Sequence, residues 1–168
     1  MQIIKKSGNL STTEIGQRII DPVAFEWFET RKRIQRKTSR NGTEVVIKFL
    51  QQSPDLSEGD ILFMDEERII SVEIIACECL VIGPQNIFET ASVCYEIGNK
   101  HLPLFFEEGK LLVPYEKPLH RLLEAQGYEI QTAVRKLLHP LNTTVAPHSE
   151  TGSGSLFSRI MQLTSGEK

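Results

Sequence analysis

The stretch CYEIGNKHLPL, residues 94–104, joins the end of one predicted element to the start of the next. A helical apolar pattern runs into Gly98, and glycine is common just beyond a helix because it adopts a positive φ without a Cβ clash. The chain then turns through Asn99 and presents His101 before a new apolar run. One histidine is a poor metal site alone, but a symmetry-related copy facing it would make a good one.

The sequence on both sides of this stretch predicts one alternating domain. An apolar strand over residues 72–81 precedes a helix that begins at Asn86, with Glu89 placed as in a capping box. One face of this helix carries the apolar positions Ile87, Ala91, Cys94 and Tyr95.

Two strands follow this helix, over residues 102–106 and 111–115. A second helix starts with Pro118 at its first position and ends at Gly127, and a strand over residues 128–134 completes the pattern. The order β-α-β-β-α-β predicts a ferredoxin-like fold.

The N-terminal part of the sequence is β-rich. A charged strand over residues 31–37 leads to Asn41-Gly42, a strong hairpin signal, and then to a Val- and Ile-rich strand over residues 43–49. Short strands at roughly ten-residue spacing indicate a small sandwich or barrel. We therefore expect an α+β chain with an all-β, sandwich-like domain over 1–74, a ferredoxin-like domain over 75–141 and a flexible tail over 142–168.

Composition excludes several classes of protein. A net charge of -3 argues against a general nucleic-acid binder, and the sequence has no apolar run long enough for a membrane-spanning helix. The N-terminus lacks the apolar core of a signal peptide, which predicts a cytoplasmic protein. No nucleophile–base arrangement, phosphate loop or H-E-x-x-H pattern appears, so we do not expect an enzyme.

Two further features each allow two interpretations. Residues 31–40 hold six basic side chains, which form either a docking face for an acidic partner or nucleic acid, with Arg33 and Arg36 as candidates, or a solvated strand protected from edge pairing. Cys77 and Cys79 form either a thiolate metal site or two small buried residues, and the second interpretation is favoured because no second cysteine pair exists.

Four histidines are the remaining candidate ligands: His101, His120, His139 and His148. His101 follows a helix C-terminus, and imidazole is a common ligand for Zn²⁺ and Ni²⁺, but a hydrogen-bonded turn histidine is an equal alternative. His120 and His139 are expected at the surface. His148 lies in the tail, which can bring an extra ligand to a site that the folded domain leaves open.

Residues 95–104, YEIGNKHLPL, resemble the signature Y-x-[LI]-G-N-[RK]-H-x-P-[LV] of the UreE family, the urease accessory nickel metallochaperones. The stretches EWFETRK (26–32), GDILF (59–63), YEKP (115–118) and PHSE (147–150) are similar to the Helicobacter-type version of the family.

This resemblance implies a peptide-binding N-terminal domain and a homodimer formed through the metal-binding domains. His101 of both subunits would bind Ni²⁺, with Zn²⁺ as competitor, and His148 would add a ligand. Nickel would pass to a GTPase partner and on to urease within the maturation complex. The alternatives are an interaction scaffold of that complex and a zinc-dependent regulatory protein. Many family members end in a histidine-rich tail, so the single tail histidine argues against nickel storage.

Overall fold

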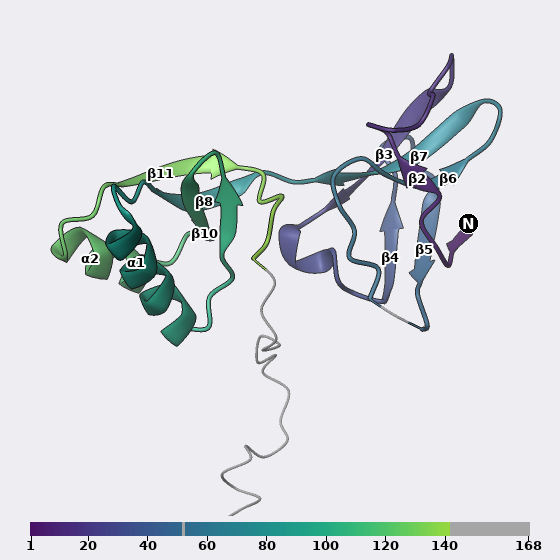
Figure 1. The fold of residues 1–168 in the computed structure, drawn as a ribbon. Coiled ribbons are helices and arrows are strands. Elements are labelled where there is room, and N and C mark those ends of the chain that lie inside the picture. The colour runs from purple at the N-terminus through teal and green to yellow at the C-terminus, as the bar shows by residue number, and fades with distance from the viewer. Residues whose placement is uncertain (52, 142–168) are drawn as a thin grey trace, which may run out of the picture.

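The computed structural model describes residues 1–51 and 53–141, which form two bodies with separate hydrophobic cores (Figure 1). The N-terminal body contains two β-sheets, and the C-terminal body contains one sheet with two helices. The predicted α+β fold is confirmed. The predicted tail over 142–168 lies outside the described residues.

The N-terminal body has a sandwich-like arrangement of its two sheets. The three-stranded sheet has the order β1 (Gln2–Ile3), β5 (Glu44–Lys48), β4 (Ile34–Thr38). The four-stranded sheet has the order β2 (Gly8–Asn9), β6 (Asp60–Met64), β7 (Arg68–Ile74), β3 (Ile19–Phe25). Strands of both sheets contribute to one core, which includes Ile3, Val23, Phe25, Val45, Ile47, Leu62, Ile70 and Val72.

The predicted hairpin is present, because β4 and β5 pair antiparallel around a turn in which Gly42 has a φ of +87°. Two details differ from the prediction. The charged strand begins only at Ile34, because the preceding chain forms a 3-10 turn, η1 (Trp27–Glu29). Strand β3 was not predicted, since its partner β7 is remote in sequence and pairs with it in parallel.

The C-terminal body is the predicted β-α-β-β-α-β unit. Its elements are β8 (Cys77–Ile82), α1 (Ile87–Asn99), β9 (Phe105–Glu107), β10 (Lys110–Pro114), α2 (Lys117–Ala125) and β11 (Ile130–Arg135). The sheet order is β11-β8-β10-β9 with antiparallel neighbours. Both helices cover one face of this sheet, and their buried residues share a core with Leu80, Ile82, Leu111 and Val113.

Three boundaries in this region differ from the prediction. The single strand predicted over residues 72–81 is two strands in different sheets, because β7 ends at Ile74 and β8 begins at Cys77. Pro118 is the second residue of α2, after Lys117. The last strand begins at Ile130, two residues later than predicted.

The face of α1 that packs on the sheet also differs from the prediction. Val93 and Ile97 are its buried residues, and of the predicted face only Cys94 packs against the same core. Ile87 and Tyr95 are 83% and 70% exposed, and Ala91 is also exposed. The 3.6-residue period allows either apolar stripe to face the core, and packing against the sheet selects the β-branched pair.

The two bodies meet on the face of the C-terminal sheet that carries no helix. A small core there contains Cys79, Val81, Phe105, Leu112 and Leu137, and Trp27 of the N-terminal body packs against it. The ring centroids of Trp27 and Phe105 lie 5.7 Å apart, edge to face. Among the described residues, no helix is long and apolar enough to cross a membrane.

Candidate metal centre

Helix α1, which leads to the candidate ligand, begins with a side-chain cap. The Asn86 side chain accepts a hydrogen bond from Glu89 N (2.9 Å), and the Glu89 carboxylate accepts one from Gln85 N (2.8 Å). These bonds satisfy backbone donors that have no partner inside the helix. The predicted start of the helix is therefore confirmed, and Glu89 reaches back one residue further than in a standard capping box.

The end of α1 corrects the prediction made for Gly98. The helix continues through Gly98 to Asn99, and the residue with a positive φ (+54°) is His101. His101 N donates to Gly98 O (3.0 Å), and Leu102 N donates to Ile97 O (3.2 Å). This pair of bonds is a Schellman motif, in which the left-handed residue directly follows the C-cap. Here that residue is His101.

The left-handed backbone conformation of His101 costs free energy and fixes the position of this residue. A non-glycine residue in the left-handed region costs roughly 1–2 kcal/mol relative to a right-handed one. Among non-glycine residues, histidine is one of those enriched there. Leu102, the next residue, packs against the core that contains Ile97. The backbone of His101 is therefore held from both sides while its side chain is exposed.

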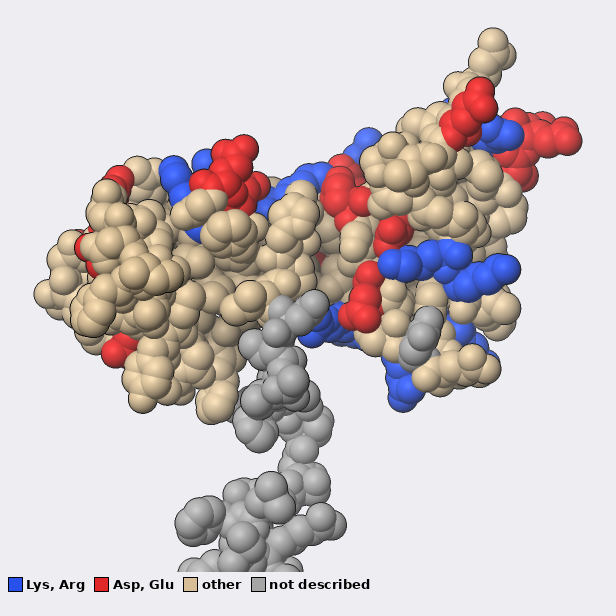
Figure 2. Space-filling view, in the orientation of Figure 1, with Lys and Arg blue, Asp and Glu red and all other residues tan. Residues whose placement is uncertain are grey.

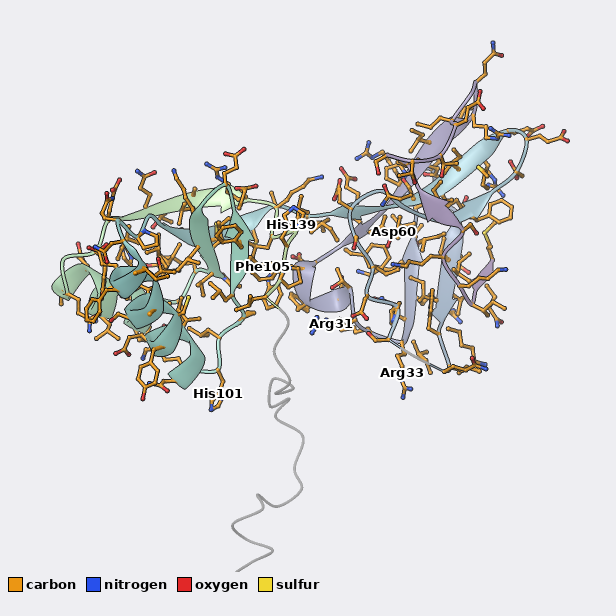
Figure 3. The ribbon with its side chains drawn as sticks, viewed as in Figure 1. Arg31, Arg33, Asp60, His101, Phe105 and His139 are labelled. Carbon is orange, nitrogen blue, oxygen red and sulfur yellow. The ribbon has the colours of Figure 1, made fainter. Side chains whose placement is uncertain are left out.

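The other described histidines lie elsewhere. His120 of α2 is half-buried, with its ring edge-on to Tyr115 at a centroid distance of 5.8 Å. His139 is exposed, and its carbonyl accepts a hydrogen bond from Phe106 N (3.0 Å). Figure 3 shows His101 at the end of α1, far from His139 beside the N-terminal body. Within residues 1–51 and 53–141, no three His, Cys, Asp or Glu residues are grouped to hold a metal ion.

His148 lies outside the described residues, but the structure shows where the chain that carries it begins. After β11, residues 139–141 run along the free edge of β9. Phe105 and Pro140 form an antiparallel bridge, and Leu141 N donates to Leu104 O (2.7 Å). Leu104 is three residues from His101, so the last described residue is fixed close to the candidate ligand. No local sequence signal indicates this pairing.

The exposed face of α1 carries large apolar side chains. Ile87, Phe88 and Tyr95 are 83%, 79% and 70% exposed, and Ala91 is also exposed. Ile87, Ala91 and Tyr95 follow a four-residue spacing, so they form one stripe on the helix. The stripe runs along α1 toward the helix end that precedes His101. A contiguous exposed apolar face of this kind is typical of an interaction site.

The cysteines take part in packing. Cys79 is fully buried in the small core between the two bodies, and its thiol donates to Ala133 O (3.3 Å). Burial raises the pKa of the Cys77, Cys79 and Cys94 thiols, which disfavours the thiolate that binds metals. These contacts support the interpretation of Cys77 and Cys79 as small packed residues.

The basic run of residues 31–40 divides into two groups. Four of its side chains form ion pairs with carboxylates: Arg31 with Asp55, Lys32 and Lys37 with Glu29, and Arg40 with Glu73. Arg33 donates to the carbonyl of Leu50 (3.4 Å). Within the described part of the chain, neither Arg33 nor Arg36 has an ion pair with a carboxylate, and both are exposed. Lys and Arg side chains are visible on this body in Figure 2.

Comparison with known proteins covers both bodies. Residues 3–75 match the model described as UreE urease accessory protein, N-terminal domain, and residues 77–153 match the C-terminal domain model of the same description. A urease accessory protein UreE of Flavobacterium johnsoniae is 43% identical over 163 residues, covering 97% of this chain and 99% of the relative. The UreE of Helicobacter pylori is 40% identical over 155 residues, covering 89% and 91%. The matches to both domain models and to these relatives therefore place the chain in the class of urease accessory proteins.

The chain belongs to the UreE family. Members of this family act as nickel-binding chaperones in urease maturation and not as enzymes. The resemblance to the Helicobacter version is real, but the Flavobacterium relative has a higher identity over more of the chain, so the comparisons do not single out the Helicobacter type.

Proposed function

We propose that this protein delivers Ni²⁺ to urease as a homodimer in which His101 of both subunits binds the metal. The observation that carries the proposal is the position of His101, held in the left-handed conformation at the end of an exposed apolar helix face. Nitrogen ligands bind Ni²⁺ more strongly than most first-row divalent ions, and Zn²⁺ competes at such sites. Without thiolates, the ion remains exchangeable.

The exposed apolar face of α1 supports the proposed dimer. A two-fold axis brings the same patch of two subunits together, and a residue that lies close to the axis meets its own copy. In this proposal the axis passes beside His101. Ile87, Ala91 and Tyr95 form such a patch, and His101 follows it. In the dimer, two imidazoles face one ion. This arrangement turns one poor ligand per chain into a shared site.

His148 supplies a further ligand in this proposal, and chain length supports it. Leu104 lies at most about 10 Å from His101 along three residues, and Leu141 pairs with Leu104 at the spacing of neighbouring strands, about 5 Å. His148 is seven residues beyond Leu141, and seven extended residues span at most about 25 Å. The reach of this segment therefore exceeds the distance to His101.

The remaining parts of the proposal concern organisation and partners. The chain is divided into an all-β domain over 1–74, a metal-binding and dimerisation domain over 75–141 and a tail over 142–168.

Nickel passes from this cytoplasmic dimer to a GTPase partner. Arg33 and Arg36, the members of the basic run without ion pairs, bind a protein of the maturation complex. An interaction scaffold with a zinc-dependent regulatory role is the alternative, and these two arginines favour its scaffold part.

Calorimetric titration of the full chain with Ni²⁺, together with sedimentation, tests the proposal. We expect about one ion per two chains. His148→Ala should weaken binding and leave the dimer intact. Unchanged stoichiometry and affinity in His101→Ala would refute the role of His101.

A second experiment compares urease activation by nickel-loaded and by zinc-loaded protein. It separates delivery from regulation, because only delivery requires nickel on the added protein.

A further inference from the structure

The outer face of the sheet β1-β5-β4 presents cations and apolar side chains in alternate positions. Strand register places Ile34 opposite Lys48 and Arg36 opposite Val46, and places Gln2 of β1 beside Val46. Directly opposite residues of neighbouring strands share a face. The inner face buries Ile3, Val45 and Ile47 in the core, so alternation directs the residues between them outward.

This outer face exposes a large apolar side chain between its charged residues. Ile34 is 66% exposed and lies opposite Lys48 on this face. Most of a large apolar side chain is therefore left in water at this position. Exposed apolar side chains next to unpaired cations are typical of a surface that another protein covers.

The cations of this face have no carboxylate partner among the described residues. Neither Arg36 nor Lys48 forms an ion pair there, whereas four members of the basic run 31–40 do. Glu44 is the carboxylate on this face, opposite Thr38, and it forms no ion pair with Arg36. The face therefore keeps a positive charge in a chain whose net charge is -3.

The spacing of the two cations specifies the geometry of a partner. Arg36 and Lys48 are diagonal neighbours across β4 and β5, because Arg36 faces Val46 and Lys48 is two residues further. Diagonal neighbours lie about 7–8 Å apart. Alternate residues of an extended chain lie on the same side and are about 7 Å apart. Two carboxylates on alternate residues therefore match the two cations.

We propose that the outer face of β1-β5-β4 binds an extended acidic segment of another urease maturation protein. Carboxylates on alternate residues of that segment pair with Arg36 and Lys48, and Ile34 covers its methylene groups. This inference rests on the proposed partner role of Arg33 and Arg36 and deepens it, because it defines the surface, the spacing and the chemistry of the partner. Arg33 borders the surface (Figure 3).

The test uses two fluorescent peptides of equal composition, bound to the full chain without nickel. One peptide has Glu on alternate residues separated by Val, and the other has the same Glu residues adjacent. We expect the alternating peptide to bind at least roughly tenfold more tightly at low salt, and added salt to reduce the difference. Equal affinity for both peptides would overturn the proposed spacing.

Variants of the full chain complete the test. The double variant Arg36→Glu and Lys48→Glu should lose roughly tenfold in affinity for the alternating peptide, and Ile34→Ser should lose less. The double variant Lys110→Glu and Lys117→Glu, an equal change of charge at exposed positions of the C-terminal body, should bind as the parent does. Unaltered binding in the double variant would overturn the proposal. Nickel titration of the same variants keeps this result separate from nickel delivery, since the face lies on the other body from His101.

Discussion

Helices α1 and α2 end in the same backbone motif with different residues at the critical position. In α2, Gly127 N donates to Glu124 O (3.0 Å) and Tyr128 N donates to Leu123 O (3.2 Å), and Gly127 has a φ of +80°. In α1, His101 occupies the equivalent place with a φ of +54°. Glycine is the low-cost residue for this conformation. The difference shows where the protein accepts strain, and the strained position is the candidate ligand.

Among substitutions at these two helix ends, the largest expected effect is the loss of nickel affinity when His101 is replaced. His101→Gly gives α1 the same end as α2, keeps the backbone turn and removes the imidazole. We expect nickel affinity to fall by at least about a hundredfold, because both copies of the shared ligand are lost together. Calorimetry measures this loss. His139→Ala, which removes an exposed imidazole away from α1, should retain nickel binding.

The reverse change, which replaces the glycine at the end of α2 by a residue with a side chain, should lower the free energy of unfolding more than the other substitutions at these helix ends. Gly127→Ala introduces a Cβ at a φ of +80°, and we expect the free energy of unfolding to fall by about 1–2 kcal/mol. The added Cβ meets no atom within 4 Å, so the loss comes from the backbone conformation. Urea unfolding at fixed protein concentration measures it. An unaltered midpoint would show that this helix end relaxes without cost.

The same His101→Gly variant should be more stable than the parent when no metal is present. Removing the left-handed non-glycine residue is expected to raise the free energy of unfolding by about 1 kcal/mol. The opposite signs of the effects on stability and nickel affinity would identify His101 as a residue kept for binding. A destabilised His101→Gly would instead show that the imidazole supports the fold.

The smallest expected effect concerns Gly98, the residue that the sequence suggested as the helix end. Gly98→Ala lies inside α1 without a positive φ, and its Cβ would meet no atom within 4 Å. We expect a gain of about 0.5 kcal/mol in the free energy of unfolding, because alanine has the higher helix propensity. A loss comparable to that of Gly127→Ala would contradict the helix end described here.

The predictions from the sequence succeeded where the signal was local. Asn86 with Glu89, Asn41-Gly42 and Gly127 each marked an element boundary correctly, because caps and turns depend on a few adjacent residues. The misassigned face of α1 shows the limit of this approach. Residues Ile87 and Tyr95 satisfy the helical period as well as Val93 and Ile97 do, and only contact with the sheet distinguishes them.

The candidate site was found in part. The residue type and the turn marked His101 as a candidate, and the resemblance of residues 95–104 to the family signature gave it a role. The strand-like pairing of Leu141 with Leu104 had no sequence signal, because it joins segments 37 residues apart. The division of the basic run into paired and unpaired cations was also absent from the sequence, since Asp55 and Glu73 reach it only through the fold.

The order of elements in the C-terminal domain, the two-part architecture, the candidate histidine and the family could be read from the sequence alone. Short-range hydrogen bonds, helix and strand periods and local motifs set these features. Only the tertiary structure decided that His101 takes the left-handed position, that the apolar stripe of α1 faces outward and that Arg36 and Lys48 share an exposed face. These features depend on contacts between segments distant in sequence, where packing selects among alternatives that local preferences leave nearly equal in energy.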